Sequence, residues 1–240
     1  SSTSRGLGDV YKRQNVIKIE VPKGGDDTRS YPPFRAKNLN GERESVYFAN
    51  INRNKKGITL NLKAPEGKEI FKELVKKADI VVENYRPGVM DKLGLGYDVL
   101  KEINPRIIYA AVSGFGCYGP YHLRPGYDIL AQAMGGMMSI TGSKGGEPTR
   151  AGSALGDILG GLHVTIGILA AVNARTITGK GQRVDVSLMD SMIAATENTA
   201  LKYIETGNIP APMGNRYAAV SPYDLSLIHI SEPTRRRGIS

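Results

Sequence analysis

Residues 79–116 read DIVVENYRPGVMDKLGLGYDVLKEINPRIIYAAVSGFG, and this stretch decides the class of fold. Its first part, DIVVENY (79–85), is typical of a buried strand, and the next part, residues 88–104, indicates two short helices. RIIYAAVSGFG (106–116) then predicts a second strand. Strands that alternate with helices at this spacing form parallel βαβ units. The stretch therefore predicts an α/β protein with an open, doubly wound parallel sheet.

The flanking sequence continues the alternation on both sides. On the N-terminal side we expect strands at 15–22 and 57–62, followed by a helix at 64–79 with Pro65 in its first turn. On the C-terminal side we expect a helix at 126–140, a long apolar helix at 157–177, a strand at 182–188 and a closing helix at 189–206. No internal repeat is visible, so we expect one domain.

The two ends of the chain are related at the level of their coding DNA. Residues 4–14, SRGLGDVYKRQ, can be encoded by a DNA whose reverse complement encodes LSLIHISEPTR, which is residues 225–235. Peptides read from opposite strands of one DNA element resemble a sequencing-library adapter at both edges of an assembled fragment. We therefore expect residues 1–14 and 225–240 to be non-native and residues 15–224 to be part of a domain that is truncated at both ends.

Charge and cysteine content narrow the class of protein. The ends hold 6 of the 32 Lys and Arg residues and 2 of the 23 Asp and Glu residues, which leaves residues 15–224 with a net charge of +5. This mild charge suits an anionic small ligand, and no nucleic-acid-binding motif is present. The single cysteine excludes a disulfide framework and a Cys-based metal site. The longest apolar run, 166–172, is shorter than the roughly 20 residues of a membrane span, so we expect a cytoplasmic protein without a nucleic-acid or membrane partner.

A lone carboxylate, Asp157, lies in RAGSALGDILGG (150–161), at the head of the long apolar helix. An aspartate there is usually an N-cap, which satisfies free N–H groups and suits the positive end of the helix dipole. The same position also keeps a carboxylate ionised, and neighbouring N–H groups can stabilise an oxyanion when the carboxylate attacks a carbonyl. Local sequence favours the cap and leaves the nucleophile open.

Two other stretches carry candidate ligand contacts. Asn84, Tyr85 and Arg86 follow a predicted parallel strand, where open α/β sheets bind ligands, although an ordinary solvated turn has the same composition. Arg86 and Lys92 suit phosphate groups, and Tyr85 suits a base. In NRNKKGITLNLK (52–63) the basic residues are either a charged sheet edge or phosphate contacts.

The stretch SGFGCYGPYHLRPGYDILAQAMGG (113–136) combines glycines with aromatic residues and predicts a long, shaped loop. Such loops are commonly functional when they are ordered. Cys117 and His122 suggest a nucleophilic pair, but no orienting Asn or Asp stands at a recognisable spacing. We therefore do not expect a nucleophilic cysteine, and we expect His163, in the apolar helix, to be a packed residue.

In this order the stretches resemble the family III CoA-transferases, the group that includes formyl-CoA transferase, carnitine CoA-transferase and the 2-methylacyl-CoA racemases. The resemblance runs from NVIKIEVPKGGDDTR (15–29) through 52–70, 78–116 and 124–136 to GSALGDILGG and beyond (152–191), and it ends at about residue 223. It implies a Rossmann-like large domain, a small domain later in the chain and an interlocked homodimer. It also implies an acyl-CoA thioester and a carboxylic acid as substrates, with no metal and no permanently bound cofactor.

The resemblance implies that Asp157 is the nucleophile, and we therefore expect it to be helix cap and catalyst at once. The aspartate would attack an acyl-CoA thioester to give a mixed anhydride and then an aspartyl-CoA thioester, from which the acceptor carboxylate takes CoA. A thiol with a pKa near 8.5 leaves readily in such chemistry. Val21 departs from the pattern, because some members have a basic residue there. The residues implied for the CoA site are Leu60, Lys63, Asn84, Tyr85, Arg86, Lys92, Arg124, Gly126, Tyr127 and Asp128.

Two other functions remain open on the sequence: a 2-methylacyl-CoA racemase and a non-catalytic CoA-binding domain. Racemases of the family carry a histidine where this chain has Tyr127, and tyrosine, with a pKa near 10, is a poor proton acceptor at neutral pH. This favours the transferase.

The 240 residues alone are expected to be aggregated or molten and inactive, because a truncated sheet exposes a pairing edge and apolar surface.

Overall fold

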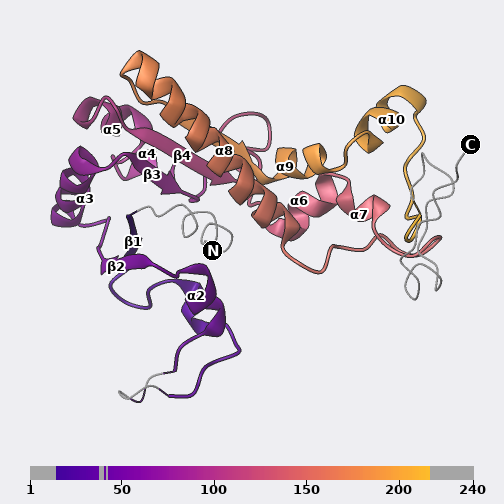
Figure 1. Ribbon diagram of the computed structural model, residues 1–240, viewed down its shortest axis with the longest axis horizontal. Coiled ribbons are helices and arrows are strands. Elements are labelled where there is room, and N and C mark those ends of the chain that lie inside the picture. Colours follow the sequence, from indigo (N-terminus) through magenta and orange to yellow (C-terminus); the bar gives the residue numbers. More distant parts are fainter. Residues whose placement is uncertain (1–14, 38–40, 42, 217–240) are drawn as a thin grey trace, which may run out of the picture.

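The computed structural model describes residues 15–37, 41 and 43–216 (Figure 1). Strands and helices alternate through most of this part of the chain. The elements are β1 (Val16–Glu20), η1 (Asp27–Ser30), α2 (Val46–Ile51), β2 (Lys55–Thr59), α3 (Pro65–Lys77), β3 (Ile80–Glu83), α4 (Val89–Lys92), α5 (Tyr97–Ile103), β4 (Ile108–Ser113), α6 (Asp128–Met134), α7 (Met137–Ile140), α8 (Leu155–Thr178), β5 (Arg183–Ser187), α9 (Leu188–Ala195) and α10 (Thr199–Thr206).

Strand β4 is the centre of the fold. It pairs in parallel with β3 on one side and with β5 on the other. Tyr109 and Ala111 pack against α3, α4 and α5, whereas Ile108, Ala110 and Val112 pack against α6, α8 and α9. Successive side chains of a strand point to opposite faces, so this apolar run fills two cores at once. Helices cover both faces of a parallel sheet, which confirms the predicted α/β fold class.

The described residues form two parallel sheets instead of the single sheet expected from the sequence. β1 and β2 pair in parallel with Ile19 opposite Ile58, apart from the sheet of β3, β4 and β5. Leu60, directly after β2, and Ile19 of β1 pack on the same core as Tyr109. The two sheets are therefore joined through apolar side chains.

Helix α8 is the longest element in the described part of the chain, with 24 residues. The helix begins two residues before the predicted range, 157–177, and ends one residue after it. Gly179 follows as the C-cap residue in the left-handed conformation (φ 72°). Its length and apolar composition would suffice to cross a membrane, a test that the core helix of a soluble protein also passes. In the structure one side of α8 packs on β4, β5 and α9.

The single closing helix predicted at 189–206 is wrong. The segment forms α9 and α10, which are separated at residues 196–198, where Glu197 has a positive φ of 52°. The predicted helix at 126–140 is likewise divided into α6 and α7, because Gly136 adopts a left-handed conformation (φ 84°). Figure 1 shows α10 at one end of the elongated molecule, beyond α9.

Candidate active site

The first turn of α8 lies at the edge of the sheet where the strands end. At the other end of this helix, Arg175 donates hydrogen bonds to the carbonyl oxygens of Asp79, directly before β3, and of Arg106, two residues before β4. The C-terminal end of α8 therefore marks the amino edge of the sheet, and its N-terminal end, with Asp157, marks the carboxyl edge. Open α/β sheets bind their ligands at that edge.

The loop between β4 and α6 returns to the same edge. Gly114 and Gly126 approach each other so closely that a Cβ atom on either would clash with the backbone of the other. Met189 N–H donates to the Gly114 carbonyl (3.1 Å), which ties the loop to the start of α9. These contacts bring the beginning of α6 beside the end of β4.

The carboxylate that caps α8 is Asp128, not Asp157. Asp157 is the third residue of the helix, and the N-cap residue, Ala154, has no side-chain cap. The Gly156 N–H instead donates to Asp128 Oδ1 (2.8 Å), which comes from the first turn of α6. The N-cap interpretation of Asp157 is therefore wrong, because an aspartate from another helix occupies that role.

Gly156 makes this borrowed cap possible. A Cβ atom at position 156 would lie 3.2 Å from Asp128 Oδ1 and 3.3 Å from the Ala131 side chain. Without a side chain, the first turn of α8 can approach α6 closely enough for the hydrogen bond. Gly156 is buried and Asp157, the next residue, is half-buried, so the candidate nucleophile is partly accessible to solvent.

A buried amide, Gln132, completes the cluster. Its Nε2 donates to both carboxylate oxygens of Asp128 (3.0 and 2.9 Å) and to the Ser153 carbonyl (3.3 Å). Its Oε1 accepts a hydrogen bond from Ala151 N–H (2.8 Å). Arg150 lies 3.9 Å from Asp128 Oδ2. Asp128, Gln132 and the segment before α8 thus form one hydrogen-bonded unit, which we call the α6–α8 cluster.

Sequence reasoning missed Gln132 and Arg150. The signal for Gln132 was present, because residues four apart on a helix are neighbours and Asp128 and Gln132 have that spacing. No local pattern connects Arg150 with Asp128, which the fold alone brings close.

The other residues predicted for a CoA site lie after the strands, and their roles stay predictions. Lys63 follows β2, whereas Asn84, Tyr85 and Arg86 follow β3 and Lys92 ends α4. Asn84 is half-buried, and the other four are exposed.

The remaining candidates have more specific surroundings. Arg124 is exposed and lies over the Tyr121 ring, 4.1 Å from its centre. Tyr127 is exposed at the start of α6. The Leu60 side chain is buried in the core, so only its backbone can contact a ligand.

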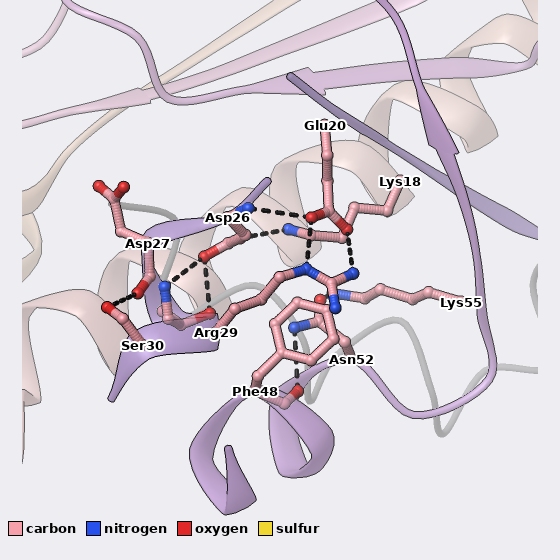
Figure 2. A network of polar contacts seen from close by, with 10 residues as sticks. Lys18, Glu20, Asp26, Asp27, Arg29, Ser30, Phe48, Asn52 and Lys55 are labelled. Atoms are coloured by element: carbon pink, nitrogen blue, oxygen red, sulfur yellow. Dashed lines mark hydrogen bonds and ion pairs between the residues drawn. The ribbon is translucent and has the colours of Figure 1, made fainter. Parts of the chain in front are cut away.

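The loop after β1 is held by a network of charged side chains (Figure 2). Arg29 donates two hydrogen bonds to Glu20 (2.8 and 2.9 Å) and lies over the Phe48 ring, and Asp26 N–H also donates to Glu20. The hydrogen bonds from Arg29 hold the pKa of Glu20 below its ordinary value. Val21, at the predicted departure from the family pattern, begins this loop and is 53% exposed.

The expected absence of a nucleophilic cysteine agrees with the surroundings of Cys117. Burial, and then the neighbouring Asp185, raise the pKa of the Cys117 thiol to about 11. His122 Nδ1 lies 2.7 Å from the Gly119 carbonyl, in its own loop. A protonated thiol is a poor nucleophile at neutral pH. His163 is half-buried in α8.

Comparison with known proteins gives a consistent result. The sequence profile described as CoA-transferase family III matches residues 15–226. The chain is 46% identical to the acetyl-CoA:oxalate CoA-transferase of Acetobacter aceti over 211 residues, which cover 88% of this chain and 53% of that protein. It is 40% identical to the succinyl-CoA:glutarate CoA-transferase of Homo sapiens over 218 residues, which cover 90% and 48%.

A solved structure agrees in fold. The crystal structure of a CAIB/BAIF family protein from Brucella suis superposes with a TM-score of 0.83 at 42% identity, and it covers 93% of this chain and 58% of that one. The chain thus spans about half the length of the curated relatives it matches.

Proposed function

The chain belongs to CoA-transferase family III, and on that premise we propose that the whole protein transfers CoA from an acyl-CoA thioester to an acceptor carboxylate, with Asp157 as nucleophile. The observation that carries the proposal is the position of Asp157. It lies in the first turn of α8, at the carboxyl edge of a parallel sheet, while another carboxylate satisfies the role of cap. Open α/β sheets bind their ligands at that edge.

The proposed reaction balances without a proton or a metal. The Asp157 carboxylate attacks the thioester carbonyl, which gives a mixed anhydride and CoA thiolate. The thiolate attacks the aspartyl carbonyl, so that the acid leaves as its carboxylate and an aspartyl-CoA thioester remains. The acceptor carboxylate displaces the thiolate to form a second anhydride, and the thiolate attacks the acceptor's carbonyl and regenerates Asp157.

The surroundings of Asp157 support this chemistry in two ways. The first turn of a helix places peptide N–H groups and the positive end of the helix dipole near a carboxylate, and both also stabilise an oxyanion at an attacked carbonyl. The exposed cations Lys63, Arg86, Lys92 and Arg124 suit the phosphates of CoA. We propose that these residues, with Asn84, Tyr85, Gly126, Tyr127 and the backbone of Leu60, line the CoA site.

The proposal concerns the whole protein. We propose that it is cytoplasmic and works as an interlocked homodimer, and that the 240 residues alone do not catalyse transfer. Exposed apolar side chains on α8 and α10 support the homodimer and the inactivity of the 240 residues alone. In the described part of the chain Ile166, Leu201 and Ile204 are more than 60% exposed. Apolar surface of this extent commonly marks an interface.

The test is chemical trapping on the whole protein, made from the complete reading frame. After incubation with acyl-CoA, hydroxylamine or borohydride should modify Asp157, which peptide mass spectrometry would locate. Asp157→Asn should lower the rate of transfer by at least roughly 10³-fold, as removal of a nucleophile does. Asp190→Asn is a matched control, since Asp190 is an exposed aspartate in the first turn of α9.

Normal turnover of Asp157→Asn would overturn the proposal. Binding of CoA to both the wild type and Asp157→Asn with no transfer to any carboxylate would instead favour a non-catalytic CoA-binding domain.

A further inference from the structure

Gln132 uses every hydrogen-bonding group of its side chain. The residue is fully buried on α6 (0% exposed). Its two amide N–H groups reach the Asp128 carboxylate and the Ser153 carbonyl, and its oxygen receives the Ala151 N–H. Carboxylate and carbonyl oxygens only accept hydrogen bonds and a peptide N–H only donates, so a single orientation of the amide satisfies all three partners.

These contacts hold the segment that leads into α8 both directly and through Asp128. Gln132 binds residues 151 and 153 directly, and it binds Gly156 indirectly, because Asp128 Oδ1 accepts both from Gln132 and from Gly156 N–H. Ala154, the N-cap residue, supplies no side-chain cap. The position of the first turn of α8 therefore depends on α6, and Gln132 connects the two.

We propose that Gln132 is a positioning residue for Asp157, which sets the backbone of the nucleophile through Asp128 and through the segment before α8. This inference rests on the proposed function. Gln132 does not contact the reacting atoms, and its role is geometric. Displacement of a reacting group by about 1 Å costs on the order of 10² in rate, which is the size of effect expected when this support is lost.

The proposal depends on donation of hydrogen bonds by Gln132, and this can be tested separately from its shape. Gln132→Glu keeps the shape but removes both N–H donors and places a second carboxyl group against Asp128, whose side chain is 13% exposed. Two adjacent carboxylates do not both ionise readily. At low pH the introduced carboxyl group would be protonated and could donate one hydrogen bond to Asp128 again.

Other charged groups nearby must be considered in this test. The titratable groups of the elements around Gln132 are Asp128 on α6, Arg150 in the segment before α8, Asp157, His163 and Arg175 on α8, and Asp190 on α9, with Arg175 at the far end of its helix. All of them are present in the wild type and in the variants. A change of pH profile seen only in Gln132→Glu therefore reports on position 132.

The experiment measures steady-state transfer and thermal unfolding of the whole protein between pH 6 and 8.5. For Gln132→Glu we expect kcat to be lowered about 10²-fold at pH 8, to recover at least in part towards pH 6, and KM for acyl-CoA to change little. Gln132→Asn keeps the amide but shortens it, so we expect a loss of kcat in the same direction without the new pH dependence.

The matched control is Asn104→Asp. Asn104 is a half-buried amide with a similar arrangement of contacts at the opposite edge of the sheet, but without a carboxylate partner. Its Nδ2 donates to the carbonyls of Val75 and Ala78, and its Oδ1 accepts from Arg106 N–H. The control should lose stability without a pH-dependent loss of kcat. Wild-type kcat in both Gln132 variants, or a loss that follows the unfolding temperature as in the control, would overturn the inference.

Failure of the inference is distinguishable from failure of the proposed function. If Asp157→Asn abolishes transfer while both Gln132 variants turn over normally, only the positioning role is wrong. If Asp157→Asn turns over normally, the proposed function itself is wrong.

Discussion

The two ends of α8 are anchored by different chemistry. At the C-terminal end, Arg175 is 9% exposed and binds the carbonyls of Asp79 and Arg106 (3.3 and 2.9 Å), and Arg106 in turn binds the Gly179 carbonyl (3.1 Å). At the N-terminal end the anchor is the α6–α8 cluster, which is built on the carboxylate of Asp128 and the amide of Gln132.

This difference separates stability from function within one helix. The C-terminal anchor joins α8 to the chain before two strands mainly through a guanidinium and two backbone carbonyls, which do not titrate between about pH 3 and 10. Its one carboxylate partner, Asp79, is 78% exposed. The N-terminal anchor places the Asp128 carboxylate one residue from the candidate nucleophile, through Gly156 N–H, so a change of charge there acts close to the reacting group. Substitutions at the first end should change the free energy of unfolding, and substitutions at the second should change catalysis.

The largest expected effect on stability is at the C-terminal anchor. Arg175→Met in the whole protein removes the donor from Arg106 O, whereas Asp79 O keeps its bond from Ile108 N–H (3.1 Å). The Arg106 carbonyl is then left unpaired at a partly buried contact, which costs up to about 1 to 3 kcal/mol, and the lost bond to the Asp79 carboxylate adds to this. We expect the free energy of unfolding to fall by roughly 2 to 4 kcal/mol, measured by denaturant titration.

The same variant should keep its kcat at a temperature at which it is folded. A fall in kcat as large as that of Gln132→Glu, with unchanged stability, would mean that the two ends do not differ in the way described.

The parts of the fold that sequence predicted are those with a local signal. The apolar runs in 79–116 and the helix that ends at Gly179 follow from periodicity and from the conformational freedom of glycine, and the parallel topology follows from their alternation. The edge of the sheet that carries the candidate site follows from topology as well, because the carboxyl ends of parallel strands coincide.

What sequence missed depends on contacts between distant residues. Local rules assign Asp157 to the role of helix cap. In the structure Asp128 has that role, because its carboxylate accepts a hydrogen bond from the N–H of Gly156, 28 positions later in the chain. The contact between Gly114 and Gly126 and the break at Glu197 are likewise set by tertiary packing. Side-chain partners of this kind have no periodic signature.

A smaller effect is expected at the carboxyl end of β1, where a carboxylate is again the anchor. The pKa of Glu20 is lowered from 4.5 by Arg29, so its contribution to stability is complete above about pH 4.5 and is lost as the pH falls through its lower folded value. Glu20→Gln should cost about 2 kcal/mol at pH 7, as expected for a charge-assisted hydrogen bond to a buried carboxylate.

The difference from wild type should shrink between about pH 5 and pH 3, measured by denaturant titration at each pH. Over the same range the effect of Arg175→Met should change less, because two of the partners of Arg175 are backbone carbonyls and its carboxylate partner, Asp79, is 78% exposed. Parallel pH dependence of the two variants would contradict the distinction between carboxylate and carbonyl anchors.

The smallest expected effect concerns Cys117, whose N–H donates to Asp185 Oδ2 (2.9 Å) in the loop after β4. Burial is the first cause that raises the pKa of the Cys117 thiol from 9.0 to about 11. At pH 8 the folded protein therefore holds roughly 100-fold less Cys117 thiolate than the unfolded chain. Alkylation by iodoacetamide, followed by mass spectrometry of the peptide that contains Cys117, should be slower by about that factor in the folded protein than in urea. Asp185→Asn should restore only part of the rate, since it leaves the burial in place. Labelling as fast as in urea would mean that this end of the sheet holds a second reactive nucleophile, and the assignment of its chemistry to Asp157 alone would have to be abandoned.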